Sequence, residues 1–415
     1  MKTVIKNISK LVQCEQSPVK FKAGDKMKEL NSISNAYIEI ENSLITDFGT
    51  MEEWKGIDDW NTTKIIDADN GMILPCYCDS HTHLVFADSR ENEFNDRING
   101  LSYQEIANNG GGILNSAKKI EKIDDELLYE KSLKRLDQLI LKGTGAIEIK
   151  SGYGLSLQSE LKILRVIKRL KENSRATIKS TFLGAHAIPS EYKNNKNEYI
   201  DLIINEMLPA IASEGLADFI DIFCEKGYFD INDTRKLLQA GKKYGLKGKT
   251  HVNQFNSFGG VKESIVNGCI SVDHLEVMNE EDFLAFENTN CIATLLPSCS
   301  FFLGIPYSPA KEFIKRNIPF NLASDFNPGS SPSGNMNFVS SLGSIKLKLN
   351  AEQVINATTI NGAYAMQIQE KFGSISIGKK ANFFITKPIP SYQYLHYSFG
   401  ENLINKVFLE GVEIK

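Results

Sequence analysis

Two histidines that stand two residues apart, His81 and His83, are the most informative point of the sequence. They end an apolar run typical of a strand. In an extended segment the side chains at i and i+2 point to the same side, so both imidazoles can face one ion. A divalent metal that activates water prefers neutral imidazole nitrogens and a carboxylate oxygen, with one position left open. His251 and Asp325 each end another strand-like run and can complete this set. We therefore predict a metal site formed by His81, His83, His251 and Asp325.

The segments that must position these residues alternate between strand-like and helix-like patterns. Residues 129–140, for example, carry apolar side chains at helical spacing, and the glycines of 143–145 end that helix before a short strand. Such alternation indicates parallel strands joined by helical crossovers, and eight units predict a closed (β/α)8 barrel of the TIM type. An open doubly wound sheet is the alternative, but no Gly-rich dinucleotide fingerprint follows the first strand. The expected strands are 73–79, 146–150, 178–183, 219–223, 246–251, 270–274, 292–296 and 319–325.

Five of the six histidines fall where these predicted strands end. Active sites of such barrels lie at the C-terminal ends of the strands, so we expect His186 and His274 on the same rim as the metal site. Tyr153 follows the second strand and is expected to point toward the barrel mouth. His396 lies elsewhere, and we interpret it as a surface or packing residue.

The two ends of the chain have a different pattern from the middle. Residues 1–70 and 366–415 contain short strands separated by turn residues, and we expect them to form one small β-sandwich domain beside a barrel that spans 71–365. The expected strands are 36–41, 43–48, 374–377, 382–386, 406–409 and 412–414.

The composition excludes several classes of protein. With 47 Lys and Arg against 51 Asp and Glu, the formal net charge is −4. Nucleic acid and anionic membrane surfaces are therefore not expected partners, because both favour a basic excess. No apolar run reaches the ~18 residues that span a bilayer, and the first residues lack a signal peptide's apolar stretch, so a cytoplasmic protein is expected. The seven Cys are odd in number and scattered, and Cys76 and Cys78 lie in an apolar run, so packing is expected rather than disulfides or metal binding.

Several motifs carry a resemblance to a known family. The longest are 79–87, 148–155 and 324–332, and shorter ones include Arg90, Glu93-Phe94, Ser102-Tyr103, Glu105-Ile106, 110–113, 182–186 and 273–275. Together they resemble the amidohydrolase superfamily and, within it, the imidazolonepropionase family. The Asp-Phe-Asn-Pro-Gly-Ser run that begins at Asp325 is the most specific of them, since a bare His-x-His pair would indicate only the superfamily.

The resemblance implies a reaction and a set of roles. The family hydrolyses 4-imidazolone-5-propanoate to N-formimidoyl-L-glutamate in histidine degradation, with one Zn²⁺ or Fe ion per chain. The implied metal ligands are the four named above. The implied substrate contacts are Arg90, Tyr153, His186, Asn327, Gly329 and Ser330. The residue chemistry agrees, because an anionic propanoate requires a guanidinium such as that of Arg90.

The proton-transfer groups are less direct to assign. Where the family can carry Glu, this chain has Gln254, and an amide is not basic at neutral pH. We therefore assign Gln254 to substrate hydrogen bonding and name Asp325, with His274 beside it, as the group that moves the proton of the attacking water. His274 or His186 could donate a hydrogen bond to the developing oxyanion.

Two further hypotheses stay open at this point. One is another cyclic amidohydrolase or deaminase on the same fold, such as a dihydroorotase or a nucleobase deaminase, which would not need Arg90. The other is a non-catalytic scaffold barrel, which loss of metal ligands would indicate, although all four are present. A small-molecule substrate and a homodimer are expected.

Overall fold

Eight parallel strands form one of the two sheets in the computed structural model, which describes residues 2–17, 19–57, 59–102, 105–106 and 109–414. Tyr103 of the family motif lies outside the described residues. The strands pair in sequence order, so each neighbour in the sheet is also the next strand of the barrel. They are β6 (Tyr77–Thr82), β7 (Thr144–Lys150), β8 (Thr177–Ala185), β9 (Phe219–Cys224), β10 (Lys247–Val252), β11 (Ser271–His274), β12 (Ile292–Leu295) and β13 (Phe320–Leu322).

The segment that follows β13 closes this sheet into a barrel. The backbone N–H of Asp325 donates to the carbonyl oxygen of His81 at 3.0 Å, and the N–H of His83 donates to the carbonyl oxygen of Phe326 at 2.8 Å. A parallel bridge between Thr82 and Phe326 lies between these bonds. The prediction of a (β/α)8 barrel is thereby confirmed.

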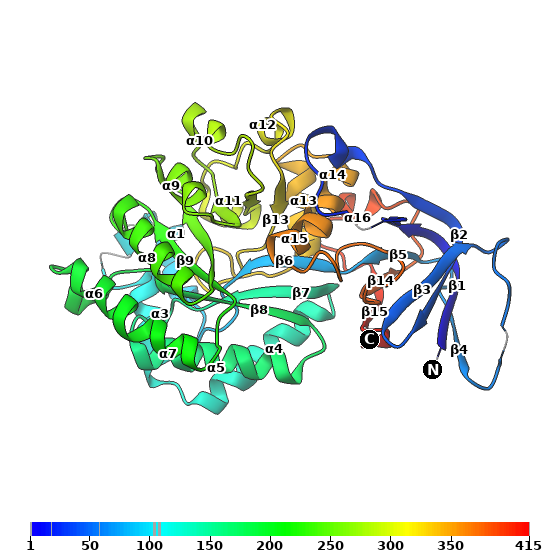
Figure 1. Cartoon of the computed structure of the whole chain (residues 1–415), viewed down its shortest axis with the longest axis horizontal. Coiled ribbons are helices and arrows are strands. Elements are labelled where there is room, and N and C mark those ends of the chain that lie inside the picture. The colour runs from blue at the N-terminus through cyan, green and yellow to red at the C-terminus, as the bar shows by residue number, and fades with distance from the viewer. Residues whose placement is uncertain (1, 18, 58, 103–104, 107–108, 415) are drawn as a thin grey trace.

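Helices surround the barrel strands, as Figure 1 shows. Their amphipathic sequences explain this placement, since α5 buries Leu161, Leu164 and Ile167 at helical spacing. Local caps define their starts, and Asp230, for example, accepts hydrogen bonds from two backbone N–H groups of α8. The helices between strands are α1 (Glu91–Ile98), α3 (Gly112–Lys122), α4 (Asp125–Ile140), α5 (Leu157–Asn173), α6 (Lys196–Leu202), α7 (Leu208–Ser213), α8 (Ile231–Lys243), α9 (Gly260–Val266), α10 (Glu280–Leu284), α11 (Pro297–Leu303) and α12 (Ala310–Lys315).

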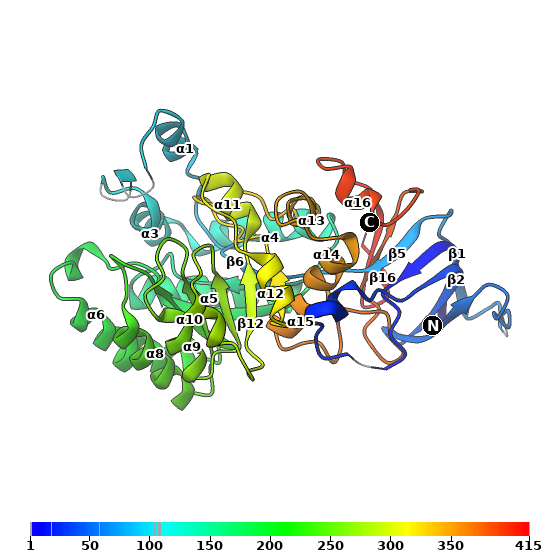
Figure 2. The same ribbon diagram turned by 90° about the horizontal axis from the view of Figure 1, so that it is seen from above.

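Further helices follow the last barrel strand, and short helical turns occur elsewhere. A π-helical turn (Ile203–Met207) joins α6 to α7. Figure 2 shows that α1 stands away from the barrel, and none of its residues is buried. No helix in the described part of the chain has the length and apolar character needed to cross a membrane. The other described helical elements are the 3-10 turns Gly24–Lys28 and Ser190–Tyr192 and the helices α13 (Met336–Ile345), α14 (Ala351–Thr358), α15 (Ile360–Ala365) and α16 (Tyr394–Tyr397).

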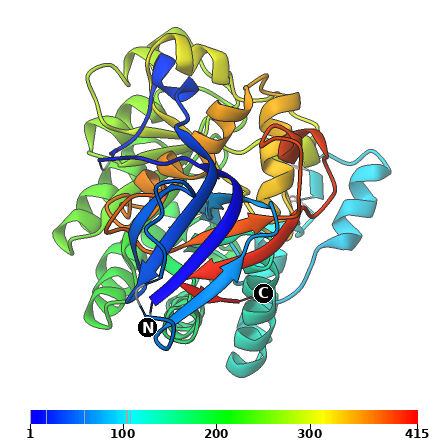
Figure 3. The same cartoon turned by 90° about the vertical axis from the view of Figure 1, so that its right-hand side faces the viewer.

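Both ends of the chain contribute to the second, mixed sheet, which stands at one end of the molecule in Figure 1 and faces the viewer in Figure 3. Its core includes Ile38 and Ile45 from the N-terminal part and Phe383 and Phe408 from the C-terminal part, which confirms the predicted union of the two ends. Its strands are β1 (Lys2–Val12), β2 (Ser32–Glu41), β3 (Leu44–Thr50), β4 (Thr63–Asp67), β5 (Met72–Pro75), β14 (Phe383–Thr386), β15 (Ile404–Leu409) and β16 (Val412–Glu413).

The strand predicted at 73–79 is wrong as a single element. Its first part is β5, which pairs with β14 in the small sheet, and its second part is β6, which pairs with β7 in the barrel. Every residue of both parts is buried, so the apolar pattern contains no signal of the change from one sheet to the other. We accordingly propose a domain boundary at residues 75–76 rather than at 70.

Two other details of the small sheet also differ from expectation. Residues 374–377 do not form a strand, because only a single bridge links Ile375 to Cys14. Strand β1 was not predicted, and its pairing with β2 shifts register between Ile5 and Ile8, where Asn7 has a φ of 54°. Such a bulge interrupts the alternation by which a strand is recognised in a sequence.

Candidate active site

One cavity at the C-terminal ends of the barrel strands contains most of the predicted site residues. Loops after β6, β7, β8 and β13 contribute to it together with the ends of β10 and β11. This placement agrees with the position of active sites in barrels of this type. The lining residues are His83, Arg90, Ile113, Tyr153, His186, Phe223, His251, Gln254, His274, Asp325, Asn327 and Ser330.

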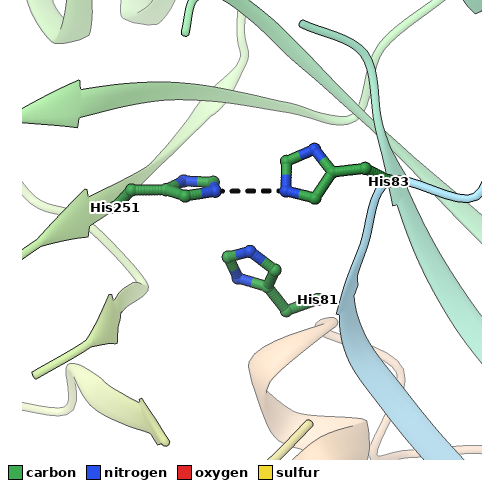
Figure 4. A group of neighbouring side chains, drawn as sticks. All are labelled: His81, His83 and His251. Atoms are coloured by element: carbon green, nitrogen blue, oxygen red, sulfur yellow. Dashed lines mark hydrogen bonds between the residues drawn. The ribbon is translucent and has the colours of Figure 1, made fainter. Parts of the chain in front are cut away.

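Three histidines, His81, His83 and His251, lie close together, as Figure 4 shows, and the last two line this cavity. Ligand nitrogens of His81, His83 and His251 lie within 4.8 Å of one another, and the Nε2 atoms of His83 and His251 are 3.3 Å apart. Asp325 Oδ1 lies 3.5 Å from His81 Nε2 and 3.6 Å from His83 Nε2. The structure therefore brings the four predicted ligands together.

These side chains fit a divalent ion. His81 Nε2 is buried and has no hydrogen-bond partner among the described residues, although it faces Asp325. Burial holds the pKa of all three imidazoles well below 6.5, so they are neutral and can donate lone pairs. Three imidazoles and one carboxylate form a set that suits zinc or iron.

Two carboxylates behind the histidines orient their rings. Asp273 Oδ2 lies 2.6 Å from His81 Nδ1, and Asp221 Oδ2 lies 3.0 Å from His251 Nδ1. A carboxylate hydrogen-bonded to Nδ1, as Asp273 is to His81, fixes the proton there and leaves Nε2 as the ligand atom, whereas Asp221 faces His251 Nδ1 without a hydrogen bond to it. Neither aspartate was predicted as a site residue.

A buried network of charges extends beneath these two aspartates. Lys150 Nζ contacts Asp221 and Glu148 at 2.7 Å each and lies 3.4 Å from Asp273. Lys249 also contacts Glu148, and all five side chains are fully buried. The sequence signal for this network is the occurrence of charged residues two apart in apolar strands, as in Glu148 and Lys150.

His274 and Asp325 adopt unusual backbone conformations. Their φ angles are 87° and 54°, in the left-handed region that non-glycine residues rarely adopt, and such strain is concentrated at functional sites. Burial by itself lowers the pKa of His274. The negative charge of Glu276, 3.4 Å from His274 Nδ1, outweighs this effect, so that the pKa of His274 is raised above 6.5. Burial raises the pKa of Asp325 to about 6.

His186 differs from His274 in its protonation. Its Nδ1 lies 3.0 Å from the carbonyl oxygen of Gly152, an acceptor, so Nδ1 must carry the proton. Burial lowers the pKa of His186 to about 4, which makes the ring neutral and Nε2 an acceptor. A Cβ on Gly152 would lie 2.8 Å from His186 Nδ1, so glycine is required for this approach.

The same cavity contains a buried guanidinium. Arg90 is 5% exposed, and its Nε and Nη1 have no hydrogen-bond partner in the described part of the chain, while Glu93 lies 3.7 Å from Nη1. The Tyr153 ring lies 5.9 Å from the guanidinium carbon. A Cβ on Gly329 would lie only 1.8 Å from Arg90 Nη2, so this glycine provides the space that Arg90 occupies.

Asn327 organises the loop that carries Gly329 and Ser330. Its Oδ1 accepts hydrogen bonds from the backbone N–H of both residues at 2.8 Å, and its Nδ2 donates to the carbonyl oxygen of Asp325 at 2.6 Å. Ser330 Oγ in turn lies 3.3 Å from Asp325 Oδ2. The specific Asn-Pro-Gly-Ser motif therefore holds Asp325 in place as well as lining the cavity.

Gln254 completes the site beside β10. Its Nε2 donates to Cys299 Sγ at 3.3 Å, which leaves the amide oxygen available to the cavity. All seven cysteines are buried, which agrees with the packing role expected of Cys76 and Cys78, and His396 is also buried, at 4% exposure.

Comparison with known proteins places this chain in a family. Residues 72–414 match the Amidohydrolase family. A protein from Christiangramia forsetii named imidazolonepropionase is 56% identical over 99% of both chains. The chain belongs to the imidazolonepropionase family. Imidazolonepropionases from Flavobacterium johnsoniae and Clostridium tetani are 55% and 40% identical, with at least 97% of each relative covered.

Solved structures show the same fold at much lower identity. Escherichia coli guanine deaminase has a TM-score of 0.77 at 14% identity, covering all of this chain and 99% of that one. An adenosine deaminase from Xanthomonas campestris with bound zinc has a TM-score of 0.73 at 12% identity, covering 99% of this imidazolonepropionase-family chain and 92% of that one. These likenesses establish the architecture alone.

Proposed function

We propose that this chain hydrolyses 4-imidazolone-5-propanoate to N-formimidoyl-L-glutamate, a step of histidine degradation. The observation that carries the proposal is the pairing, in one cavity, of the His81–His83–His251–Asp325 group with the buried guanidinium of Arg90. The first group suits hydrolysis of an amide, and the second suits an anionic tail. The near-full-length likeness to relatives named imidazolonepropionase supports the same assignment.

His81, His83, His251 and Asp325 would hold one Zn²⁺ or Fe ion. When bound there, such an ion supplies Lewis-acid chemistry that activates water and polarises a carbonyl. Asp273 and Asp221 keep the Nε2 atoms of His81 and His251 turned toward this position.

Binding of the substrate is assigned to the Arg90 part of the cavity. Arg90 pairs with the propanoate carboxylate in a water-poor site, where a charge-assisted hydrogen bond is strong. Tyr153 covers the guanidinium, and Gly329 leaves room for it. His186 Nε2 and the amide oxygen of Gln254 are acceptors, so both are placed to receive hydrogen bonds from ring N–H groups.

Proton transfer is assigned to Asp325 and His274. The Asp325 carboxylate takes the proton of the attacking water and delivers it to the ring nitrogen as the carbon–nitrogen bond breaks. His274, whose pKa is raised, donates from its ring to the oxyanion, and Glu276 holds its other nitrogen. The donor role considered for His186 is withdrawn, because its neutral ring has an acceptor at Nε2.

The deciding experiment mixes the purified protein with freshly prepared imidazolone propionate and follows loss of the substrate's ultraviolet absorbance. Dihydroorotate and guanine serve as alternative substrates for the other cyclic amidohydrolases and deaminases. Elemental analysis should find about one zinc or iron per chain, and His81→Ala should remove both metal and turnover. Turnover of guanine or dihydroorotate in place of imidazolone propionate would reject the proposal. The solution mass of the same preparation tests the expected homodimer.

A further inference from the structure

A second group of metal-ligand side chains lies next to the three-histidine group. Ligand atoms of His274, Glu276 and Cys299 lie within 4.8 Å of one another, and all three residues are buried. His274 and Glu276 come from the end of β11 and the turn after it, and Cys299 comes from the first turn of α11. None of the three belongs to the ligand set of the proposed catalytic ion.

Glu276 has an oxygen that the described protein atoms leave unsatisfied. Its Oε1 lies 3.4 Å from His274 Nδ1 and accepts a hydrogen bond from Ser300 Oγ at 3.3 Å. Its Oε2 is buried and has no hydrogen-bond partner among the residues described. A buried carboxylate oxygen without a partner is costly, so a ligand that contacts it stabilises the site.

The donor set of this group is selective. One imidazole nitrogen, one carboxylate oxygen and one sulfur suit zinc and the softer cadmium, and they do not suit magnesium. Ligand atoms around a tetrahedral zinc ion lie roughly 3–4 Å apart, so the observed spacing requires only a small inward movement. Three protein ligands leave a fourth position for water.

We propose that His274, Glu276 and Cys299 bind a second, thiophilic divalent ion, Zn²⁺ or Cd²⁺, and that this ion inhibits the enzyme. Binding replaces the hydrogen of the thiol by the metal and releases that proton to solvent. The first site offers four ligands, the three histidines and Asp325, whereas this group offers three, so the second site fills later and only at excess metal.

Inhibition follows from the residues that the ion occupies. It takes the Glu276 carboxylate away from His274 and binds the ring that donates to the oxyanion. This part of the inference rests on the proposed function, whereas the binding of the ion does not. Binding and inhibition are therefore measured separately.

The binding experiment titrates the full-length protein, already loaded with one Zn²⁺ per chain, with Cd²⁺. The number of bound ions and the thiolate-to-cadmium charge-transfer absorbance are recorded together. The wild type should bind a second ion and develop the band as it does so. Cys299→Ser should lose the band and bind the second ion about 10–100-fold more weakly. Glu276→Gln, which keeps the size of the side chain, should retain the thiol and still weaken the second ion.

Cys291→Ser is the matched control, because Cys291 is a free, buried cysteine outside the group and should behave as the wild type does. The second site would be overturned by a band that develops while the total metal content stays at one ion per chain. A band that survives in Cys299→Ser would overturn it as well. In a parallel assay, excess Zn²⁺ should reduce kcat of the wild type at least about tenfold more than that of Glu276→Gln, relative to each protein's own rate. Equal inhibition of both would overturn the inhibitory role. Absence of turnover in every protein would instead count against the proposed function, and the binding arm would still decide the site.

Discussion

The ammonium of Lys150 lies 2.7 Å from Asp221 Oδ2, the same oxygen that lies 3.0 Å from His251 Nδ1. Lys150 also lies 3.4 Å from the Asp273 oxygen that contacts His81. One lysine thus links the two carboxylates that orient two of the proposed metal ligands. Because it is fully buried, its charge compensates theirs in a medium where unpaired charges are costly.

Lys150→Met should therefore weaken metal binding about 10–100-fold, because the orientation and basicity of His81 and His251 are lost with their partners. Competition with a chelator gives the metal affinity. Lys379→Met is the matched control, since Lys379 is a buried lysine that contacts Phe372 and Ser374 in the small domain. Both variants should lower the melting temperature, but only the first should release metal more readily. Equal metal affinities in the two variants would reject the role of Lys150.

Arg90→Lys should lower kcat/KM by at least about tenfold while metal content stays unchanged. A lysine retains the charge but cannot form the bidentate contact with a carboxylate that a guanidinium forms. The control is Arg135→Lys, in which the guanidinium lies against Phe86 and donates to backbone carbonyls of the same loop region. If the two substitutions affect kcat/KM equally, Arg90 does not bind the substrate's tail.

Gly329→Ala tests whether the glycine acts through Arg90. Its new methyl group would meet the guanidinium at 1.8 Å, so Arg90 must move and kcat/KM should fall by a similar factor. In the Arg90→Ala background the guanidinium is absent, so adding Gly329→Ala should lower kcat/KM little further. Steady-state kinetics of the four proteins give this double-mutant cycle. Additive losses would show that Gly329 contacts the substrate independently.

Asp325→Asn should abolish turnover per bound metal, because an amide cannot accept the proton of water. Gln254→Glu should give no gain and should raise KM, because it adds a charge near an anionic substrate. Measurement of kcat per bound metal across pH, for both variants, shows whether Asp325 or the side chain at position 254 governs proton transfer. Substantial turnover by metal-loaded Asp325→Asn would transfer the base to another group, and a large gain in kcat by Gln254→Glu would show that Gln254 limits the reaction.

His396 should make stability depend on pH. Burial lowers its pKa from 6.5 to about 4, so the unfolded chain binds the proton more tightly than the folded chain does. The contribution of the neutral His396 ring to the free energy of unfolding is therefore complete above pH 6.5. It is lost as the pH falls toward 4, and the loss is at most about 3 kcal/mol. Denaturant unfolding of the wild type and His396→Gln at pH 7 and pH 5 measures this effect. The difference between the proteins should change with pH, and a constant difference would show that His396 does not titrate as expected.

Much of the barrel could be predicted because its signals are local. Strand-like runs end at His81, His186, His251 and His274, and such patterns need only neighbouring residues. The orienting aspartates could not be found in this way. Asp273 and His81 are 192 positions apart, and Lys150 and Asp221 are 71 apart, so their pairing exists only in the folded barrel.

The change of sheet between Pro75 and Cys76 was hidden for a different reason. Both β5 and β6 are buried, and burial on both sides removes the alternation that distinguishes one strand from the next. The role of Gly329 was also beyond the sequence, because the reason for a glycine there is the position of Arg90.

The closure of the barrel has a consequence for how the protein assembles. The seam between β6 and the segment after β13 carries His81 and His83 on one side and Asp325 on the other, and Ser324 bonds to Asp79 across 245 positions of chain. Contacts this distant in sequence form late, because a long loop must be closed before they stabilise anything. A growing polypeptide therefore holds an incomplete ligand set until its last barrel strand has been made. An ion bound by these residues would cross-link β6 to the segment after β13. Completion of the metal site and closure of the barrel would then be a single folding event.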